Sequence, residues 1–150
     1  MSNNSETKKA LNELLQGEYM AVDSFNNFIS RLEDENAIEC LKEVQKQHRE
    51  NIDKLASYIQ DIGGQPDENI GMKGKMGEMM LNMELGSETD MSEIIEKAIE
   101  GETKGVNMAE KVLRGALDDR SRNIAGVILE EDRKSIEKLK SLFKNIEEPN

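Results

Sequence analysis

The chain has 150 residues, a usual length for one domain with a single buried core. Asp and Glu number 31 against 20 Lys and Arg, which gives a formal net charge of -11. This excess of negative charge argues against nucleic acid and membrane surfaces as partners, because both are bound through clustered Lys and Arg. Helix-forming residues are abundant, and no apolar run approaches the roughly 18 residues of a membrane span.

The N-terminus carries no apolar run after its charged residues, so we expect a disordered tail over about residues 1–6 and a cytoplasmic protein. Cys40 is the only cysteine, which excludes an internal disulfide, a Cys-x-x-Cys redox pair and a thiolate zinc site. No organic cofactor is evident. We expect residues 1–150 to form a single all-α domain.

Apolar residues spaced three and four apart predict a first helix between residues 8 and 33. A short polar turn follows, and the same spacing predicts a second helix from Ala37 to Ile62. Gly63-Gly64-Gln65-Pro66 ends this helix, because glycine can adopt the left-handed conformation and proline cannot continue a helix. The short turn makes these two helices an antiparallel hairpin.

The next segment, about residues 64–90, is rich in methionine and predicts a long crossover that contains a short helix. We expect its methionines to fill gaps at the end of the bundle, in preference to binding copper(I). Asp90 is placed to cap a third helix whose apolar positions continue to Ala116. After the turn at Asp118 and Asp119, a fourth helix has apolar positions from Ile124 to Phe143. The predicted fold is an antiparallel four-helix bundle of two hairpins.

Each predicted helix also carries polar residues within its apolar stripe. At about 100° per residue, Gln45 and His48 fall within roughly 40° of the stripe of the second helix. A shift of 87 residues places Asp132 and Ser135 at the corresponding positions of the fourth helix. The inward polar residues are Glu18, Gln45, His48, Glu102, Asp132 and Ser135. At about 1.5 Å rise per residue they lie at a similar height, so we expect one buried polar layer.

An isolated buried carboxylate is costly, and it is normally protonated, paired with a cation or bound to a metal. No Lys or Arg lies at the centre of these stripes, which leaves His48 or a metal ion as the partner. We favour a metal site. The alternative is a metal-free hydrogen-bond network in which His48 pairs with one acid, while Gln45 and Ser135 complete the remaining hydrogen bonds.

The pattern Glu18-x-x-Ala21-x-x-x-Phe25-x-x-Phe28 resembles the first helix of rubrerythrins. Over about residues 8–144 the chain resembles the ferritin-like superfamily, including a small group of bacterial proteins without assigned function. The resemblance implies a ferritin-like bundle with a site of the di-iron type. In such sites two helices each supply one Glu, and the other two each supply Glu-x-x-His.

The chain keeps only part of that ligand pattern. Glu18 and Glu102 match the single glutamates. Gln45-x-x-His48 replaces the bridging acid with an amide, and the corresponding motif of the fourth helix keeps an acid, Asp132, but lacks the histidine. Three inward acids suit one divalent ion better than two, with iron(II), manganese(II) or zinc(II) all admissible. We predict the ligand set Glu18, Gln45, His48, Glu102 and Asp132. A slip of one residue would place Glu131 inward in place of Asp132.

Two functions remain open. The first is a metal-binding protein with oxygen or peroxide chemistry, which would need an external electron donor because the cysteine pairs of a rubredoxin domain are absent. The second is a metal-free structural or interaction bundle that has lost the di-iron chemistry. The sequence therefore leaves open whether the protein is an enzyme. We expect a homodimer, and an iron-storage shell is disfavoured because no fifth helix follows the bundle.

Overall fold

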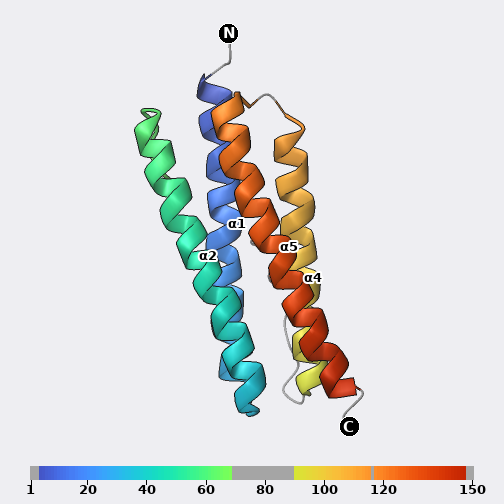
Figure 1. Ribbon diagram of the computed structural model, residues 1–150. Coiled ribbons are helices and arrows are strands. Elements are labelled where there is room, and N and C mark those ends of the chain that lie inside the picture. Colours follow the sequence, from blue (N-terminus) through green and yellow to red (C-terminus); the bar gives the residue numbers. More distant parts are fainter. Residues whose placement is uncertain (1–3, 69–89, 116, 148–150) are drawn as a thin grey trace.

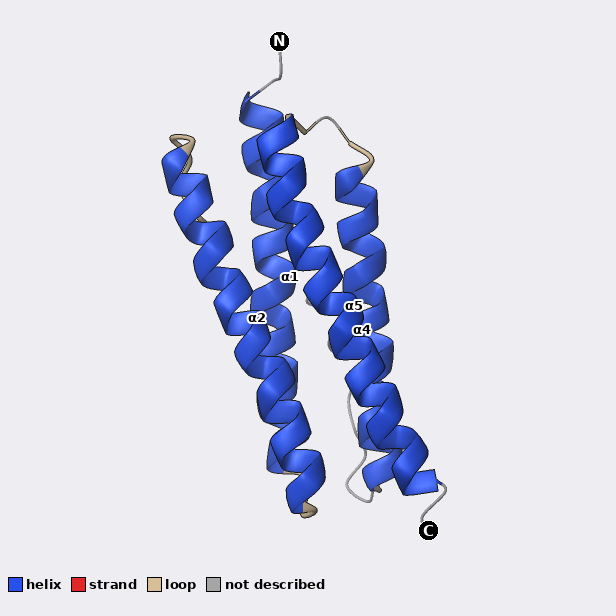
Figure 2. Ribbon diagram, viewed as in Figure 1, coloured by secondary structure: helices blue, strands red, loops and turns tan. Residues whose placement is uncertain are grey.

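The computed structural model describes residues 4–68, 90–115 and 117–147 (Figure 1). They form four helices, α1 (Asn4–Ser30), α2 (Glu35–Asp61), α4 (Met91–Leu113) and α5 (Asp119–Glu147). The described residues contain no strand (Figure 2). The predicted all-α four-helix bundle is confirmed. The predicted Met-rich helix of the crossover lies outside the described residues.

The bundle consists of two antiparallel hairpins, α1 with α2 and α4 with α5 (Figure 1). Contacts of α1 with α4 and of α2 with α5 join the hairpins. The end of α2 and the start of α4 lie at opposite ends of the bundle in Figure 1, so these two helices run in the same direction. This direction agrees with the predicted long crossover, because a short loop can only connect antiparallel neighbours.

Short polar and glycine residues set the helix ends. The Asp34 side chain accepts a hydrogen bond of 2.9 Å from the Ala37 amide and caps α2, and Asp90 accepts one of 2.9 Å from the Glu93 amide and caps α4. Gly63 follows α2 with a φ of 81°, a left-handed conformation that glycine adopts without a side-chain clash. Each of these ends agrees with the turn and cap residues predicted from sequence.

The N-terminus differs from the prediction. A disordered tail over residues 1–6 is wrong for residues 4–6, because α1 already begins at Asn4. The Asn4 side chain donates to the Ile62 carbonyl at 3.4 Å, and Thr7 is fully buried at 0 % exposure. This first turn packs against the end of α2, which a polar sequence such as Asn-Ser-Glu-Thr does not reveal.

Polar side chains of α1 also hold the chain that follows α2. Asn12 donates to the Gln65 carbonyl at 3.2 Å and accepts from the Asp67 amide at 2.8 Å. Gln16 donates to the Asp67 carbonyl at 2.5 Å. The start of the crossover is therefore fixed along the side of α1.

The link between α4 and α5 depends on one arginine. The Arg122 guanidinium donates to the Leu113 carbonyl and, at 3.2 Å each, to the carbonyls of Gly115 and Leu117. These carbonyls lie at and just beyond the end of α4, where backbone oxygens have no partner within the helix. Arg122 thus completes the hydrogen bonds of this turn from the first residues of α5.

The apolar core forms two clusters. One surrounds Leu15 and Ile52, and the other surrounds Phe25 and Val44. Along α1, Glu18 lies between Leu15 and Phe25, and along α2, His48 lies between Val44 and Ile52. Along α1 and α2 a polar layer therefore lies between the two apolar clusters, and the predicted buried layer is present.

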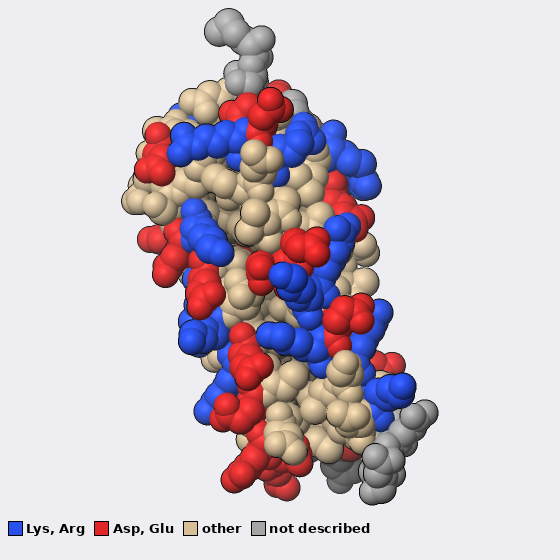
Figure 3. Space-filling view, viewed as in Figure 1, with Lys and Arg blue, Asp and Glu red and all other residues tan. Residues whose placement is uncertain are grey.

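The surface carries both positively and negatively charged side chains. On the face shown in Figure 3, Lys and Arg are interspersed with Asp and Glu rather than gathered in one area. Among the helices that the structure describes, none combines the length and the hydropathy that crossing a bilayer requires.

Candidate metal centre

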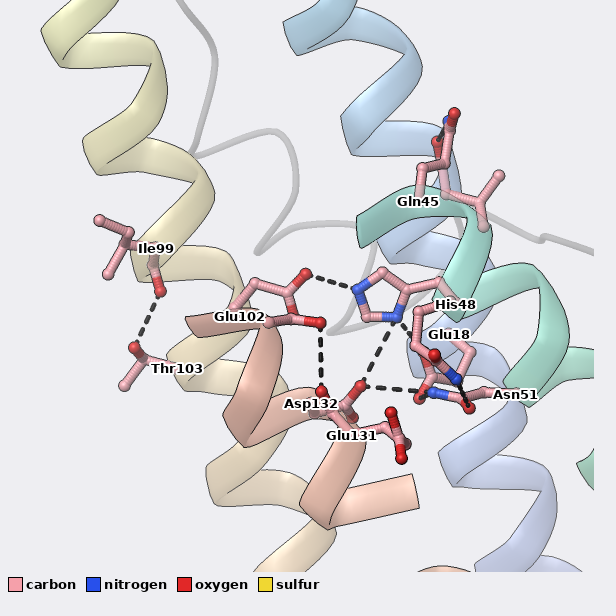
Figure 4. A network of polar contacts seen from close by, with 12 residues as sticks. Glu18, Gln45, His48, Asn51, Ile99, Glu102, Thr103, Glu131 and Asp132 are labelled. Carbon is pink, nitrogen blue, oxygen red and sulfur yellow. Dashed lines mark hydrogen bonds and ion pairs between the residues drawn. The ribbon is translucent and has the colours of Figure 1, made fainter. Parts of the chain in front are cut away.

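The His48 imidazole forms the centre of the polar layer. Its Nδ1 contacts a carboxylate oxygen of Glu18, and its Nε2 lies 2.5 Å from Glu102 Oε1 (Figure 4). The three residues come from α2, α1 and α4 and are only 2 %, 5 % and 4 % exposed. With a proton on each ring nitrogen, His48 can donate one hydrogen bond to each glutamate.

The fourth helix contributes Asp132, which is 6 % exposed. Its Oδ1 lies 3.7 Å from His48 Nδ1, on the side of the ring that faces Glu18. Asn51 joins these two acids, since its Nδ2 lies 3.2 Å from Glu18 Oε1 and 3.5 Å from Asp132 Oδ1. Every described helix therefore supplies at least one side chain to the cluster.

Three of these side chains are close enough to share an ion. One ligand atom from each of Glu18, His48 and Asp132 lies within 4.8 Å of the other two. Divalent ions of the zinc and iron type bind carboxylate oxygen and imidazole nitrogen at about 2.0–2.2 Å, so small movements would bring all three atoms to one ion. Glu102 faces the other ring nitrogen, from which a metal-bound histidine normally donates to a carboxylate.

Burial and charge shift the pKa values of the cluster. Burial lowers the pKa of His48, but Glu102 and Glu18 outweigh that effect and hold the pKa well above its usual range. Burial, together with the nearby Glu18, raises the pKa of Asp132 to about 9. Asp132 therefore carries a proton near pH 7, and the two glutamates favour a proton on His48 as well, so an ion competes with protons for both ligands.

The structure brings Glu18, His48, Glu102 and Asp132 together, as predicted, but not Gln45. Gln45 is buried, yet its amide donates to the Val22 carbonyl at 2.9 Å and to Asn26 Oδ1 at 2.8 Å. Figure 4 shows its side chain directed away from the cluster. The predicted membership of Gln45 is therefore corrected, because hydrogen bonds to α1 hold its amide outside the cluster.

The choice between the two acids of α5 is also decided. Asp132 is buried, whereas the side chain of Glu131 is 28 % exposed and lies 3.7 Å from Lys134. Ser135 is buried as predicted, but its hydroxyl donates to the Glu131 carbonyl at 3.1 Å, within its own helix. It makes no described hydrogen bond to the cluster.

Sequence reasoning did not single out Asn51, which is completely buried at 0 % exposure. Its position, three residues after His48, places it on the same face of α2 and is the signal that could have identified it. The Asn51 Oδ1 also accepts from Gln47 at 3.1 Å. Its amide is thereby oriented with both hydrogens toward the acids.

Two antiparallel hairpins whose facing helices α2 and α4 run in the same direction make a four-helix bundle with the ferritin-like fold. The chain belongs to the family described as a domain of unknown function (DUF2383), whose profile matches residues 6–115. No curated protein matches the chain.

Solved structures share the fold at low sequence identity. A ferritin-like, diiron-carboxylate protein from Bacillus anthracis str. Ames has a TM-score of 0.72 and 20 % identity, over 95 % of this chain and 99 % of that one. A dodecameric thioferritin, the bacterioferritin-related protein from Bacteroides fragilis, has a TM-score of 0.75 and 16 % identity, over 96 % and 88 %.

A two-domain protein from Anabaena variabilis ATCC 29413, with DJ-1/ThiJ/PfpI-like and ferritin-like domains, has a TM-score of 0.79 and 16 % identity. The match covers 99 % of this chain but only 39 % of that protein. At these identities the comparisons establish the fold alone, since one fold can carry unrelated chemistry.

Proposed function

We propose that the protein binds one divalent metal ion, of the iron(II), manganese(II) or zinc(II) class, through Glu18, Asp132 and the Nδ1 atom of His48. The observation that carries this proposal is the convergence of these three ligand atoms within 4.8 Å in a buried layer. The charge supports one ion rather than two. Once Asp132 has lost its proton, the three acids Glu18, Glu102 and Asp132 carry three negative charges in total. These charges can neutralise the two positive charges of one divalent ion but not the four of a pair.

Two neighbours would orient the ligands. Glu102 accepts from the Nε2 hydrogen of His48 and so favours the tautomer that leaves Nδ1 free for an ion. Asn51 donates to both Glu18 and Asp132, which holds the two carboxylates at a fixed separation. Removing such outer partners typically weakens metal binding about 10- to 100-fold.

Three protein ligands would leave coordination positions open for an exogenous molecule, as in catalytic rather than structural metal sites. An ion of the iron type supplies one-electron chemistry with oxygen or peroxide when it is bound. We include this chemistry in the proposal. Since Cys40 is the only cysteine, electrons for turnover would come from a separate donor protein.

A competing function is a metal-free structural or interaction bundle. It is favoured by the hydrogen bonds of the cluster, because Glu18, His48, Glu102, Asp132 and Asn51 all have partners without an ion. It predicts a stable protein that takes up no metal. A homodimer is compatible with either function, and sedimentation equilibrium would measure the oligomeric state independently.

The test is elemental analysis and anaerobic titration with iron(II), manganese(II) and zinc(II) of protein purified without chelator. The proposal expects about one ion per chain, lost in Glu18→Ala. Glu131→Ala is the matched control, because Glu131 is a more exposed acid next to the ligand Asp132 and pairs with Lys134. No stoichiometric binding by the unaltered chain, or equal binding by Glu18→Ala, would reject the site.

A further inference from the structure

A cavity of about 90 Å³ lies between α1 and α4 and reaches the buried cluster. Most of its walls are apolar or small, with Met20 supplied by α1 and Met108 by α4. Its lining also includes His48 and Glu102, so it ends at the imidazole ring. The cavity therefore connects the α1 and α4 face of the bundle with the otherwise buried polar layer.

Glycines explain why this space stays open. Gly17 of α1 and both Gly101 and Gly105 of α4 line the cavity. Glycine is unfavourable inside a helix, so three in the same walls need a physical reason. Backbone conformation is not the reason, since Gly63 alone among the described glycines has a positive φ.

Close packing is not the reason at Gly105 either. A Cβ atom added there would meet no other atom within 4 Å. Gly105 is exposed and forms part of the mouth of the cavity. The missing side chain therefore leaves room between solvent and the interior, where most residues would place atoms.

We propose that this cavity admits a small neutral molecule, of up to about three non-hydrogen atoms, from solvent to His48 and the carboxylates. The volume fixes the size, because one water molecule occupies about 30 Å³ in the liquid. The residues that line the cavity determine which charge the entering molecule can have. Glu18 and Glu102 at the inner end repel anions, which outweighs Lys104 elsewhere in the lining because these two acids are buried. A cation loses its hydration along the apolar walls and regains ligands only at the carboxylates, so a neutral molecule enters at the lowest cost. The inference goes beyond metal binding and applies to the metal-free chain.

Xenon is a suitable probe, because it is neutral and binds apolar cavities of this kind. Metal-free protein is equilibrated with increasing xenon pressure while the Met20 and Met108 methyl signals and the His48 ring signals are recorded by NMR. His48 is the only histidine, so its ring signals need no assignment. We expect saturable shifts at all three residues and none at Val127, which is 51 % exposed on α5.

Gly105→Leu places a side chain at the mouth and should weaken xenon binding at least tenfold. The midpoint of thermal unfolding should stay equal or rise, because leucine favours the helix more than glycine does. The matched control is Gly126→Leu in α5, where an added Cβ also meets no atom within 4 Å and where the residue does not line the cavity. This control should bind xenon as the unaltered chain does.

Two results would overturn the proposal. The first is the absence of saturable shifts at His48 in the unaltered chain, which needs no variant. The second is equal xenon binding in Gly105→Leu and Gly126→Leu. Because no metal is present, a failure here is distinguishable from a failure of the metal titration, and either result can occur without the other.

Discussion

The substitution Glu102→Gln separates a metal ligand from a residue that orients one. Glu102 Oε1 lies 2.5 Å from His48 Nε2, whereas the ligand atoms of Glu18 and Asp132 gather near the opposite ring nitrogen. Glutamine keeps the size of the side chain and can still accept a hydrogen bond, but it removes the charge. We expect one ion per chain to remain, with affinity about 10- to 100-fold weaker, or about 1.4–2.7 kcal/mol.

Thermal unfolding measures this difference directly. An ion at a hundred times its Kd stabilises the folded chain by about 2.7 kcal/mol, which raises Tm by roughly 5–11 °C for a domain of this size. At the same ion concentration, Glu102→Gln should retain about 0.4–1.4 kcal/mol, a rise of roughly 1–6 °C. Glu18→Gln should show almost no rise.

The stoichiometry decides the role. If Glu102→Gln loses stoichiometric metal as completely as Glu18→Gln does, Glu102 is itself a ligand and the arrangement around His48 Nδ1 is wrong. Glu131→Gln serves as the control for removing a nearby charge, and its metal-dependent rise in Tm should equal that of the unaltered chain.

Three further predictions follow from the same contacts. Because the pKa values of His48 and Asp132 are both raised, an ion competes with protons for both ligands, so metal affinity should increase from pH 6 to 8 and calorimetry in buffers of different ionisation enthalpy should detect proton release. Asn51→Ala removes donors to two acids and should weaken metal binding about 10-fold in a metal titration, and unchanged affinity would exclude an orienting role. Arg122→Ala removes three hydrogen bonds at the end of α4 and should destabilise the fold by about 1–3 kcal/mol in urea, with metal stoichiometry unaffected.

The fold could be predicted because apolar spacing, caps and turns agree along the chain. Asp34, Gly63 and Asp90 mark helix ends through local backbone chemistry, which sequence displays directly. The start of α1 could not be predicted in this way. It depends on contacts of Asn4 and Thr7 with distant residues, and such contacts exist only after the hairpin forms.

In the site, too, local geometry could be predicted from the sequence, whereas contacts between distant residues could not. The direction of the Cα–Cβ bond follows from helix geometry, so the inward positions of Glu18, His48 and Asp132 could be found by counting. The final direction of a long side chain depends on its rotamer and its partners. Gln45 starts inward but turns to Asn26, while Asn51 is fixed by acids from two other helices.

The polar layer divides its members between the two halves of the molecule. Glu18 and His48 belong to the α1–α2 hairpin, and Glu102 and Asp132 to the α4–α5 hairpin. An ion held by Glu18, His48 and Asp132 would therefore cross-link the hairpins, and its binding would be thermodynamically linked to their docking. By reciprocity, any event that loosens the contact between the halves would release the ion, and chelation would make their separation easier.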